Sequence, residues 1–189
     1  DLGVAQIARQ VRERTLSPVE LVESLLARID KPEQLNAWVY LDREAVLSDA
    51  EKKLKELDLG GASVGPLHGV PIGLKDIYYT AGIPTTACSK VYANHVPEYD
   101  ATTVTLMKGA GAIMLGKTVT TEFACMDPSP TLNPWNAAHT PGGSSSGSAV
   151  AVASRMCPAA TGPRSDDHTS ELQSRRNPVC RPLPATNNT

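Results

Sequence analysis

The chain has 189 residues, of which 41% are hydrophobic and 20% are charged, and its formal net charge is −2. This composition is typical of one soluble globular domain that can bury its own core. It argues against direct nucleic-acid binding, which favours excess positive charge and more aromatic side chains than the 4% present here. It also argues against a membrane helix, since no apolar run approaches about 20 residues.

Three helices are predicted before residue 60. A short amphipathic helix is indicated by the helical spacing of Val4, Ile7, Ala8 and Val11. A second helix begins at Ser17, which we expect to be its N-cap, with Pro18 in the first helical position and Glu20 completing a capping box. Its apolar stripe consists of Leu21, Val22, Leu25, Leu26 and Ile29. A third helix is expected over residues 43–57, ended by Gly60 and Gly61.

The middle of the chain alternates apolar strands with helices. Residues 70–76 and 112–117 are predicted to form buried strands, and residues 102–109 a short helix between them. Alternation of this kind predicts an α/β fold in which helices cover a sheet. From residue 163 onward the sequence is polar and rich in arginine, asparagine and proline, so we expect this tail to be disordered or foreign to the domain.

The cysteines and histidines show no metal-ligand spacing. The four cysteines are far apart and form no Cys-x-x-Cys pair, so neither a zinc site nor a disulfide framework is expected. Free thiols are typical of a reducing compartment, and we expect a cytoplasmic protein that uses no metal and no cofactor.

One segment satisfies a phosphate-binding pattern. Residues 111–118, from Gly111 to Thr118, read G-x-x-x-x-G-K-T, which is the P-loop pattern. A P-loop requires a polar, exposed loop between its glycines, whereas residues 112–115 are the apolar strand itself. A nucleotide-binding module is therefore the least favoured of the functions considered.

A loop rich in serine and glycine is the most informative part of the sequence. Residues 141–148 read Pro-Gly-Gly-Ser-Ser-Ser-Gly-Ser, and the apolar run 149–153 follows as a predicted helix. Glycines allow a tight loop, and the start of a helix directs N–H groups toward an anion. A flexible linker has a similar composition, but linkers do not usually lead into buried helices.

Lys75 is a candidate catalytic base. It ends a predicted buried strand, and burial lowers the pKa of an amine toward neutrality, where it can accept a proton from a serine hydroxyl. Two structural alternatives remain open from spacing alone: the side chain reaches the surface, or it pairs with Asp76.

Four segments together resemble the amidase signature family. They are Gly-Val-Pro-Ile-Gly-Leu-Lys-Asp at 69–76, Thr-Glu-Phe-Ala at 121–124, Asn-Pro-Trp-Asn at 133–136, and the serine-rich loop at 141–148. The resemblance extends over about residues 1–162. It implies a mixed sheet covered by helices, and amide hydrolysis through a Ser–cis-Ser–Lys triad.

The resemblance also assigns residues to roles. Lys75 matches the catalytic lysine, and Ser144 matches the bridging serine that follows a cis peptide bond. Cys125, Met126 and Asp127 occupy the stretch that lies beside the substrate in the family, although ordinary loop packing explains these residues equally well. We assign Met126 and Asp127 to substrate binding, together with two neighbours of Ser144, namely Gly143 and Ser145.

The third member of the triad is absent from this sequence. In the family the nucleophilic serine lies about two dozen residues after the bridging serine, in a Gly-Gly-Ser loop, and here that position falls near His168 with no such loop. Residues 164–174 instead resemble the conceptual translation of a DNA sequencing adapter. We therefore expect residues 1–162 to be part of an amidase domain, residues 163–189 to be a non-family tail, and the 189-residue polypeptide to be inactive.

Two functions follow from the resemblance. The first is a stand-alone amidase acting on a small-molecule amide, alone or as a homo-oligomer. The second is the A subunit of a glutamine-dependent aminoacyl-tRNA amidotransferase, which would bind partner subunits. That subunit usually carries a Gly-Ser-Ser-type run after Glu-Phe-Ala, whereas residues 125–128 here read Cys-Met-Asp-Pro, which favours the stand-alone enzyme.

Overall fold

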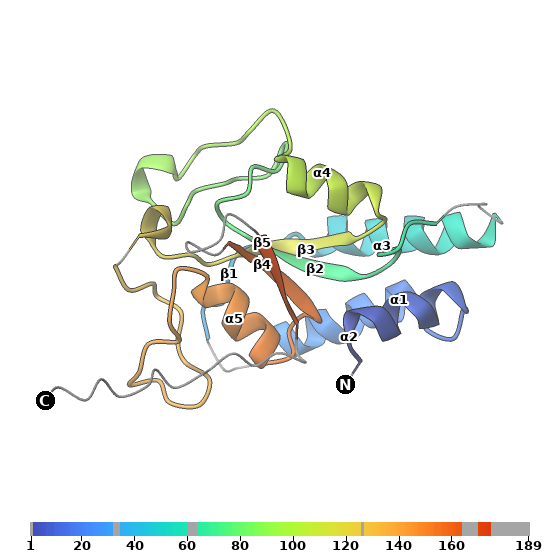
Figure 1. The fold of residues 1–189 in the computed structure, drawn as a ribbon, viewed down its shortest axis with the longest axis horizontal. Helices are drawn as coiled ribbons and strands as arrows, with labels where there is room; N and C mark the ends of the chain where they lie inside the picture. Colours follow the sequence, from blue (N-terminus) through green and yellow to red (C-terminus); the bar gives the residue numbers. More distant parts are fainter. Residues whose placement is uncertain (1, 32–34, 60–63, 126, 164–169, 175–189) are drawn as a thin grey trace, which may run out of the picture.

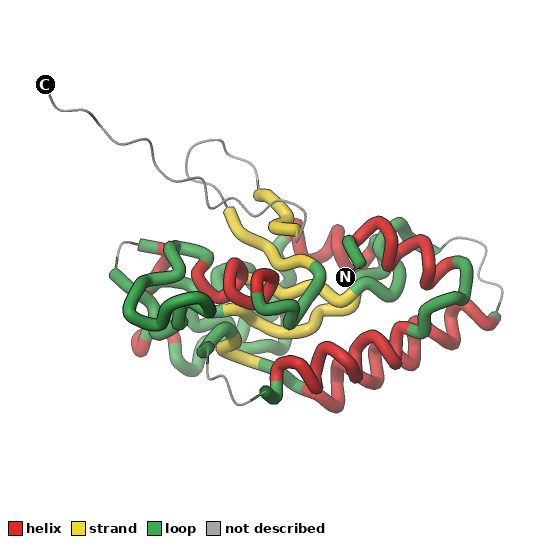
Figure 2. Tube along the Cα trace, turned by 90° about the horizontal axis from the view of Figure 1, so that it is seen from below, coloured by secondary structure: helices red, strands yellow, loops and turns green. Residues whose placement is uncertain are grey.

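The protein is described by a computed structural model that covers residues 2–31, 35–59, 64–125, 127–163 and 170–174. Its strands form one mixed sheet in the order β1-β3-β2-β4-β5. In Figure 1, α4 lies on one side of these strands and α1, α2 and α5 on the other. Figure 2, turned by 90°, shows the same strands running between helical segments. The predicted α/β fold with a mixed, helix-covered sheet is confirmed.

The three predicted N-terminal helices are present. They are α1 (Val4–Arg12), α2 (Pro18–Ile29) and α3 (Arg43–Asp58). Ser17 is the N-cap of α2, but its side chain makes no capping hydrogen bond, so the capping box expected with Glu20 does not form. Pro18 lacks an N–H group, and the first turn therefore has one fewer donor that needs an acceptor. Gly60 and Gly61, expected to end α3, lie outside the described residues.

Two parallel strands form the centre of the sheet. They are β2 (Pro71–Lys75) and β3 (Ile113–Thr118), and they are connected through α4 (Thr102–Gly109). Their register places Lys75 opposite Thr118 and Leu74 opposite Lys117. Every residue of β2 is buried, as expected for a strand whose two faces are both covered. Lys75, the last residue of β2, and Lys117, the next-to-last residue of β3, are therefore two buried lysines on neighbouring strands.

Three strands were not expected from the sequence. β1 (Trp38–Tyr40) pairs antiparallel with β3, β4 (Ala159–Pro163) pairs parallel with β2, and β5 (Ser170–Ser174) pairs antiparallel with β4. β1 has only three residues, and β4 consists of Ala-Ala-Thr-Gly-Pro, which has low intrinsic strand preference. Both form because they complete the sheet beside stronger strands. β5 is the described part of the tail that follows residue 163.

The core consists of two groups of buried apolar side chains. The first joins α2, α3, β3 and α5, and includes Val22, Ala50, Ile113 and Val150. The second joins α1, β2 and α4, and includes Val11, Ile72, Leu74 and Val104. These groups fix the helices on the sheet and so position the strand ends. Among the residues that the structure describes, no helix combines the length and apolar character needed to cross a bilayer.

Helix α5 (Ser146–Ala153) lies against the sheet because Gly147 has no side chain. A Cβ atom at this position would lie 2.4 Å from both Ala37 O and Val119 N. The Gly147 N–H group instead donates to Val119 O at 2.9 Å. This close approach of two backbones holds the start of α5, and with it the serine-rich loop, beside the end of β3.

We expect Gly147→Ala to lower the free energy of unfolding by about 1–3 kcal/mol, because the added methyl group forces backbone away from backbone. Urea denaturation followed by circular dichroism measures this change. Gly109→Ala in α4 is the matched control, since a Cβ atom there meets nothing within 4 Å. Equal stability of the two variants would contradict the close-packing argument.

Candidate functional site

Lys75 is fully buried at the end of β2, with 0% of its surface exposed. Its backbone N–H group donates to Thr161 Oγ1 of β4 at 2.8 Å, which fixes the strand end. Its Nζ donates to Ser144 Oγ at 2.6 Å, across 69 residues of sequence. The sequence left open that the Lys75 side chain reaches the surface or pairs with Asp76. It does neither, because it is buried and its Nζ contacts Ser144. The structure brings Lys75 and Ser144 into direct contact.

The loop that carries Ser144 is held by its backbone. Ser144 O accepts hydrogen bonds from Thr121 N at 3.0 Å and from Thr120 Oγ1 at 3.0 Å. The Gly143–Ser144 peptide bond is cis, as the family resemblance implies. The helix that follows begins at Ser146 rather than at residue 149, so the last three residues of the serine-rich segment belong to α5. The loop is thus fixed to the segment after β3.

Burial changes the protonation of Lys75. Desolvation lowers the pKa of the Lys75 amine from 10.5 to about 8, and the nearby Cys88 thiol opposes this change only in part. Near neutral pH a usable fraction of the amine is therefore unprotonated. An amine in that form can accept the proton of the Ser144 hydroxyl, which lies within hydrogen-bond distance.

A second buried lysine, Lys117, lies on the neighbouring strand β3. Lys117 on β3 is 1% exposed, and its Nζ donates to Tyr78 O at 2.8 Å and to Thr85 Oγ1 at 2.6 Å. It also forms an ion pair with Asp76 Oδ1 at 3.3 Å. Asp76, the alternative partner of Lys75 in the sequence, is therefore paired with the other lysine. Sequence reasoning missed this pair, although two lysines that each end an apolar strand were a visible signal.

The partners of Asp76 come from the loop that follows β2. Asp76 Oδ2 accepts hydrogen bonds from Thr86 N at 3.0 Å and from Thr86 Oγ1 at 2.6 Å. Two residues later the backbone of Cys88 has a positive φ of 50°, and the Cys88 Sγ atom accepts from Thr120 N at 3.3 Å. Burial raises the pKa of the Cys88 thiol, and an ionised Cys88 would in turn raise the pKa of Lys75.

The other predicted site residues lie at or near the serine-rich loop. Gly143 is exposed, and Ser145 is the buried N-cap residue of α5. Asp127 is exposed, and the contacts described above for Lys75 and Ser144 do not include it. Met126 lies outside the described residues. Their predicted contacts with a substrate stay predictions. Within the described ranges, no three or more His, Cys, Asp or Glu side chains gather as they would around a metal ion.

The segment that matches the P-loop pattern is not a loop. Its residues 113–118 form β3, and Lys117, the residue that would bind phosphate, is buried and ion-paired with Asp76. Gly116 lies inside the strand, where a Cβ atom would be 2.6 Å from Tyr40 O. The glycine is therefore explained by packing against β1.

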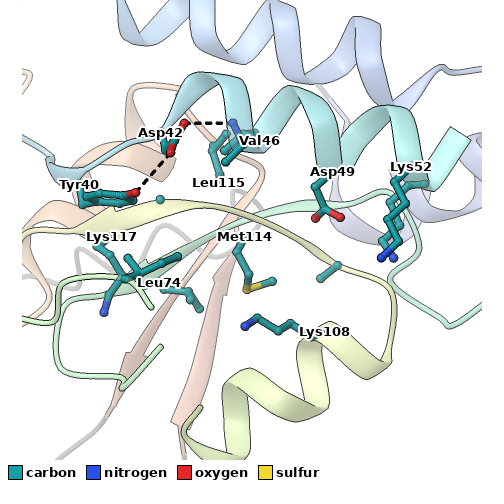
Figure 3. A pocket seen from close by; sticks show the side chains of 15 residues that line it. Tyr40, Asp42, Val46, Asp49, Lys52, Leu74, Lys108, Met114, Leu115 and Lys117 are labelled. Carbon is teal, nitrogen blue, oxygen red and sulfur yellow. Dashed lines mark hydrogen bonds between the residues drawn. The ribbon is translucent and has the colours of Figure 1, made fainter. Parts of the chain in front are cut away.

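A cavity of about 560 Å³ lies between α3, β3 and α4, and neither Lys75 nor Ser144 lines it (Figure 3). Asp49 and Lys52 from α3 and Lys108 from α4 surround a floor that includes Met114. Desolvation raises the pKa of Asp49 although nearby lysines act in the opposite direction. Its rim carries both signs of charge, and we place the candidate site at Lys75 and Ser144, which do not line this cavity.

Comparison with known proteins places the chain in a family. A family model described as Amidase matches residues 20–166, which is more than half of the chain. The chain belongs to the amidase signature family. Within the amidase signature family, one relative is the A subunit of the glutamyl-tRNA(Gln) amidotransferase of Streptomyces avermitilis. It is 42% identical to this chain over 168 residues, which cover 85% of this chain and 33% of the relative.

Solved structures of the family agree with the fold. The native peptide amidase of Stenotrophomonas maltophilia superposes with a TM-score of 0.76 at 33% identity, over 86% of this chain and 36% of that one. A bacterial aryl acylamidase of the amidase signature family superposes with a TM-score of 0.78 at 29% identity, over 85% of this chain and 35% of that one. The chain thus spans about a third of the length of the curated relatives that it matches.

Proposed function

We propose that residues 1–162 supply the lysine and the bridging serine of an amide-hydrolysing active site. The observation that carries this proposal is the 2.6 Å hydrogen bond between the buried Lys75 Nζ and Ser144 Oγ. A lysine without solvent contact, with a pKa lowered to about 8 and a serine hydroxyl in reach of its Nζ, is suited to general-base catalysis.

The proposed reaction transfers one proton through Ser144. The neutral Lys75 amine takes the proton of the Ser144 hydroxyl as Ser144 takes the proton of a nucleophilic serine. The nucleophile attacks the amide carbonyl, the C–N bond breaks, and the leaving amine receives the proton from Lys75 by the same path. Water then cleaves the acyl-enzyme. The nucleophile and its oxyanion donors would come from a segment that follows residue 162 in the family.

We also propose that the amidase part of this sequence, which is only a portion of the domain, ends near residue 162. The family match ends at residue 166, and β4 ends at Pro163. Sequencing genomic DNA of the source past codon 162 tests this boundary. We expect an uninterrupted frame that encodes a Gly-Gly-Ser loop about two dozen residues after Ser144, and a genomic frame identical to residues 163–189 would refute the boundary.

The polypeptide of 189 residues is expected to hydrolyse no amide above the buffer rate, because loss of even one oxyanion donor costs about 10²–10³ in rate. A hybrid that joins residues 1–162 to the matching remainder of the peptide amidase should hydrolyse a peptide amide. Liquid chromatography of the released acid measures both. Ser144→Ala in the hybrid is the control, and a hybrid that keeps full activity with this change would contradict the proposed relay.

A second candidate is the A subunit of a glutamine-dependent tRNA amidotransferase. It is favoured by the curated relatives, which are glutamyl-tRNA(Gln) amidotransferase A subunits at 42% and 44% identity. Residues 125–128 favour the stand-alone enzyme, which would act on a small-molecule amide without partner subunits. The complete gene product distinguishes the two: co-purification with subunits encoded beside it, together with glutamine hydrolysis, would support the amidotransferase.

A further inference from the structure

We propose that Thr161 on β4 is a positioning residue, which binds both the backbone of Lys75 and the first turn of α5 and so keeps Lys75 Nζ within reach of Ser144 Oγ. This role rests on the proposed function, in which Lys75 takes the proton of the Ser144 hydroxyl. It concerns a side chain that belongs to none of the motifs of the proposed site.

The end of β2 needs a hydrogen-bond acceptor that the backbone ladder does not supply. The register between the parallel strands β2 and β4 ends where Gly73 lies opposite Ala160, two residues before Lys75. The buried Lys75 N–H group donates instead to the side-chain Oγ1 of Thr161, at 2.8 Å. A buried N–H group without an acceptor costs as much free energy as a lost hydrogen bond. The Thr161 hydroxyl therefore takes the place of a backbone acceptor at this strand end.

The side of the strand end that faces β3 is bound by backbone groups. Asp76 N donates to Thr118 O at 3.0 Å, and in the turn that follows, Ile77 N donates to Lys75 O at 2.8 Å. These bonds hold the chain just after the Lys75 side chain branches from it. Thr161 adds the contact from the β4 side, so a variant without this acceptor would leave the strand end held from one side.

The backbone of Thr161 also binds α5. Its carbonyl oxygen accepts a hydrogen bond from Ser148 Oγ at 2.7 Å, and Ser148 Oγ lies 2.7 Å from Thr118 Oγ1. A hydroxyl has one proton and a carbonyl can only accept, so Ser148 donates to Thr161 and Thr118 donates to Ser148. All three residues are buried. Because Ser148 follows Ser144 by four residues, these bonds fix the helix start that carries Ser144 against β4.

The contacts of Thr161 and the proposed proton path form a closed ring. Lys75 Nζ donates to Ser144 Oγ at 2.6 Å, while the backbone N–H of Lys75 is bound to Thr161. Thr161 is bound in turn by Ser148, from the helix that continues the chain after Ser144. A base acts only within hydrogen-bond distance of the proton that it takes, and a misplacement of about 1 Å can lower a rate by about 10². The separation of Lys75 Nζ and Ser144 Oγ thus depends on Thr161.

The test uses the 189-residue chain and two NMR measurements on Lys75. Thr161→Val keeps the shape of the side chain but accepts no hydrogen bond, whereas Thr161→Ser keeps the acceptor. The first measurement compares hydrogen exchange at the amide of Lys75 with that at the amide of Ile72 in the same strand. In Thr161→Val the ratio of the two exchange rates should rise about tenfold. A general loss of stability would speed exchange at both amides equally.

The second measurement is the titration midpoint of the Lys75 amine, followed with ¹³C-labelled lysine and assigned through Lys75→Met. The unchanged chain should show a midpoint near 8, because burial lowers the pKa of this amine. In Thr161→Val the looser strand end admits water to the amine, so the midpoint should rise by about one unit. Cys88, which also acts on this pKa, is the same in every variant. Thr161→Ser should give the exchange ratio and the midpoint of the unchanged chain.

Thr131→Val is the matched control, because Thr131 is also a buried threonine whose hydroxyl binds the backbone, at Asn36 O, 2.9 Å away. It should leave both measurements on Lys75 unchanged. If Thr161→Val does not fold, Thr161→Ala, which also lacks the acceptor, replaces it with the same expected results. An unchanged exchange ratio, or a raised ratio with an unchanged midpoint, would overturn the role of Thr161. A midpoint near 10.5 in the unchanged chain would instead contradict the proposed function.

Discussion

Lys75→Met in the hybrid of residues 1–162 and the peptide amidase remainder is expected to lower kcat/KM by about 10²–10⁴. Methionine fills the buried space at the end of β2, so the fold should be kept. Methionine accepts no proton, so the expected loss is that of a missing general base. Initial rates of peptide-amide hydrolysis, measured with the unchanged hybrid in parallel, give the ratio.

The pH profile separates a lost base from a distorted site. Activity of the unchanged hybrid should rise toward pH 8 as Lys75 loses its proton, since its pKa is about 8 in the folded chain. The residual activity of Lys75→Met should lack this rise. Lys90→Met, at an exposed lysine, is the control and should keep both rate and profile. A profile that retains its rise in Lys75→Met would show that another group is the base.

Lys75→Met is also expected to stabilise the 189-residue chain at pH 7. The folded state lowers the pKa of Lys75 from 10.5 to about 8. Between these values the unfolded chain binds the proton that the folded chain has released, so the free energy of unfolding rises with pH through this window. Below pH 8 the folded chain carries the whole cost of the buried charge, about 3 kcal/mol. Lys75→Met removes that cost and loses one hydrogen bond, a net gain of about 2 kcal/mol.

Urea denaturation at pH 7 and at pH 10.5 measures this gain. At the higher pH the amine is neutral in the folded chain and only half protonated in the unfolded chain, so the advantage of Lys75→Met should disappear and the variant should be slightly less stable through the lost contact with Ser144. The exposed Lys90→Met should change stability little at either pH. An unchanged chain whose stability did not increase between pH 8 and 10 would contradict the lowered pKa.

Hydrophobic periodicity was sufficient to predict the helices and the two central strands. The stripe from Leu21 to Ile29 and the apolar runs before Lys75 and Lys117 each form the element that their spacing indicates. β4 could not be predicted in this way, because Ala-Ala-Thr-Gly-Pro has neither alternation nor strand-forming side chains. Its extended form comes from pairing with β2, which is a tertiary effect.

The site was predicted in part. Lys75 and Ser144 were identified from their motifs, and the structure places them in contact. The sequence did not indicate that Asp76 pairs with Lys117, because they are far apart along the chain and only the register of β2 against β3 brings them together. The apparent P-loop was the strongest misleading signal, and its glycine and lysine are explained by strand packing and by this ion pair.

The separation of 69 residues between the two partners of the Lys75–Ser144 contact has a consequence for folding. We expect this contact to form late, because non-local contacts form slowly during the assembly of a parallel sheet. Until then the lysine is hydrated and carries its full charge. Between pH 8 and 10 the protonation of this one amine therefore reports whether the chain has reached its native topology, so that proton release can serve as a kinetic probe of late assembly.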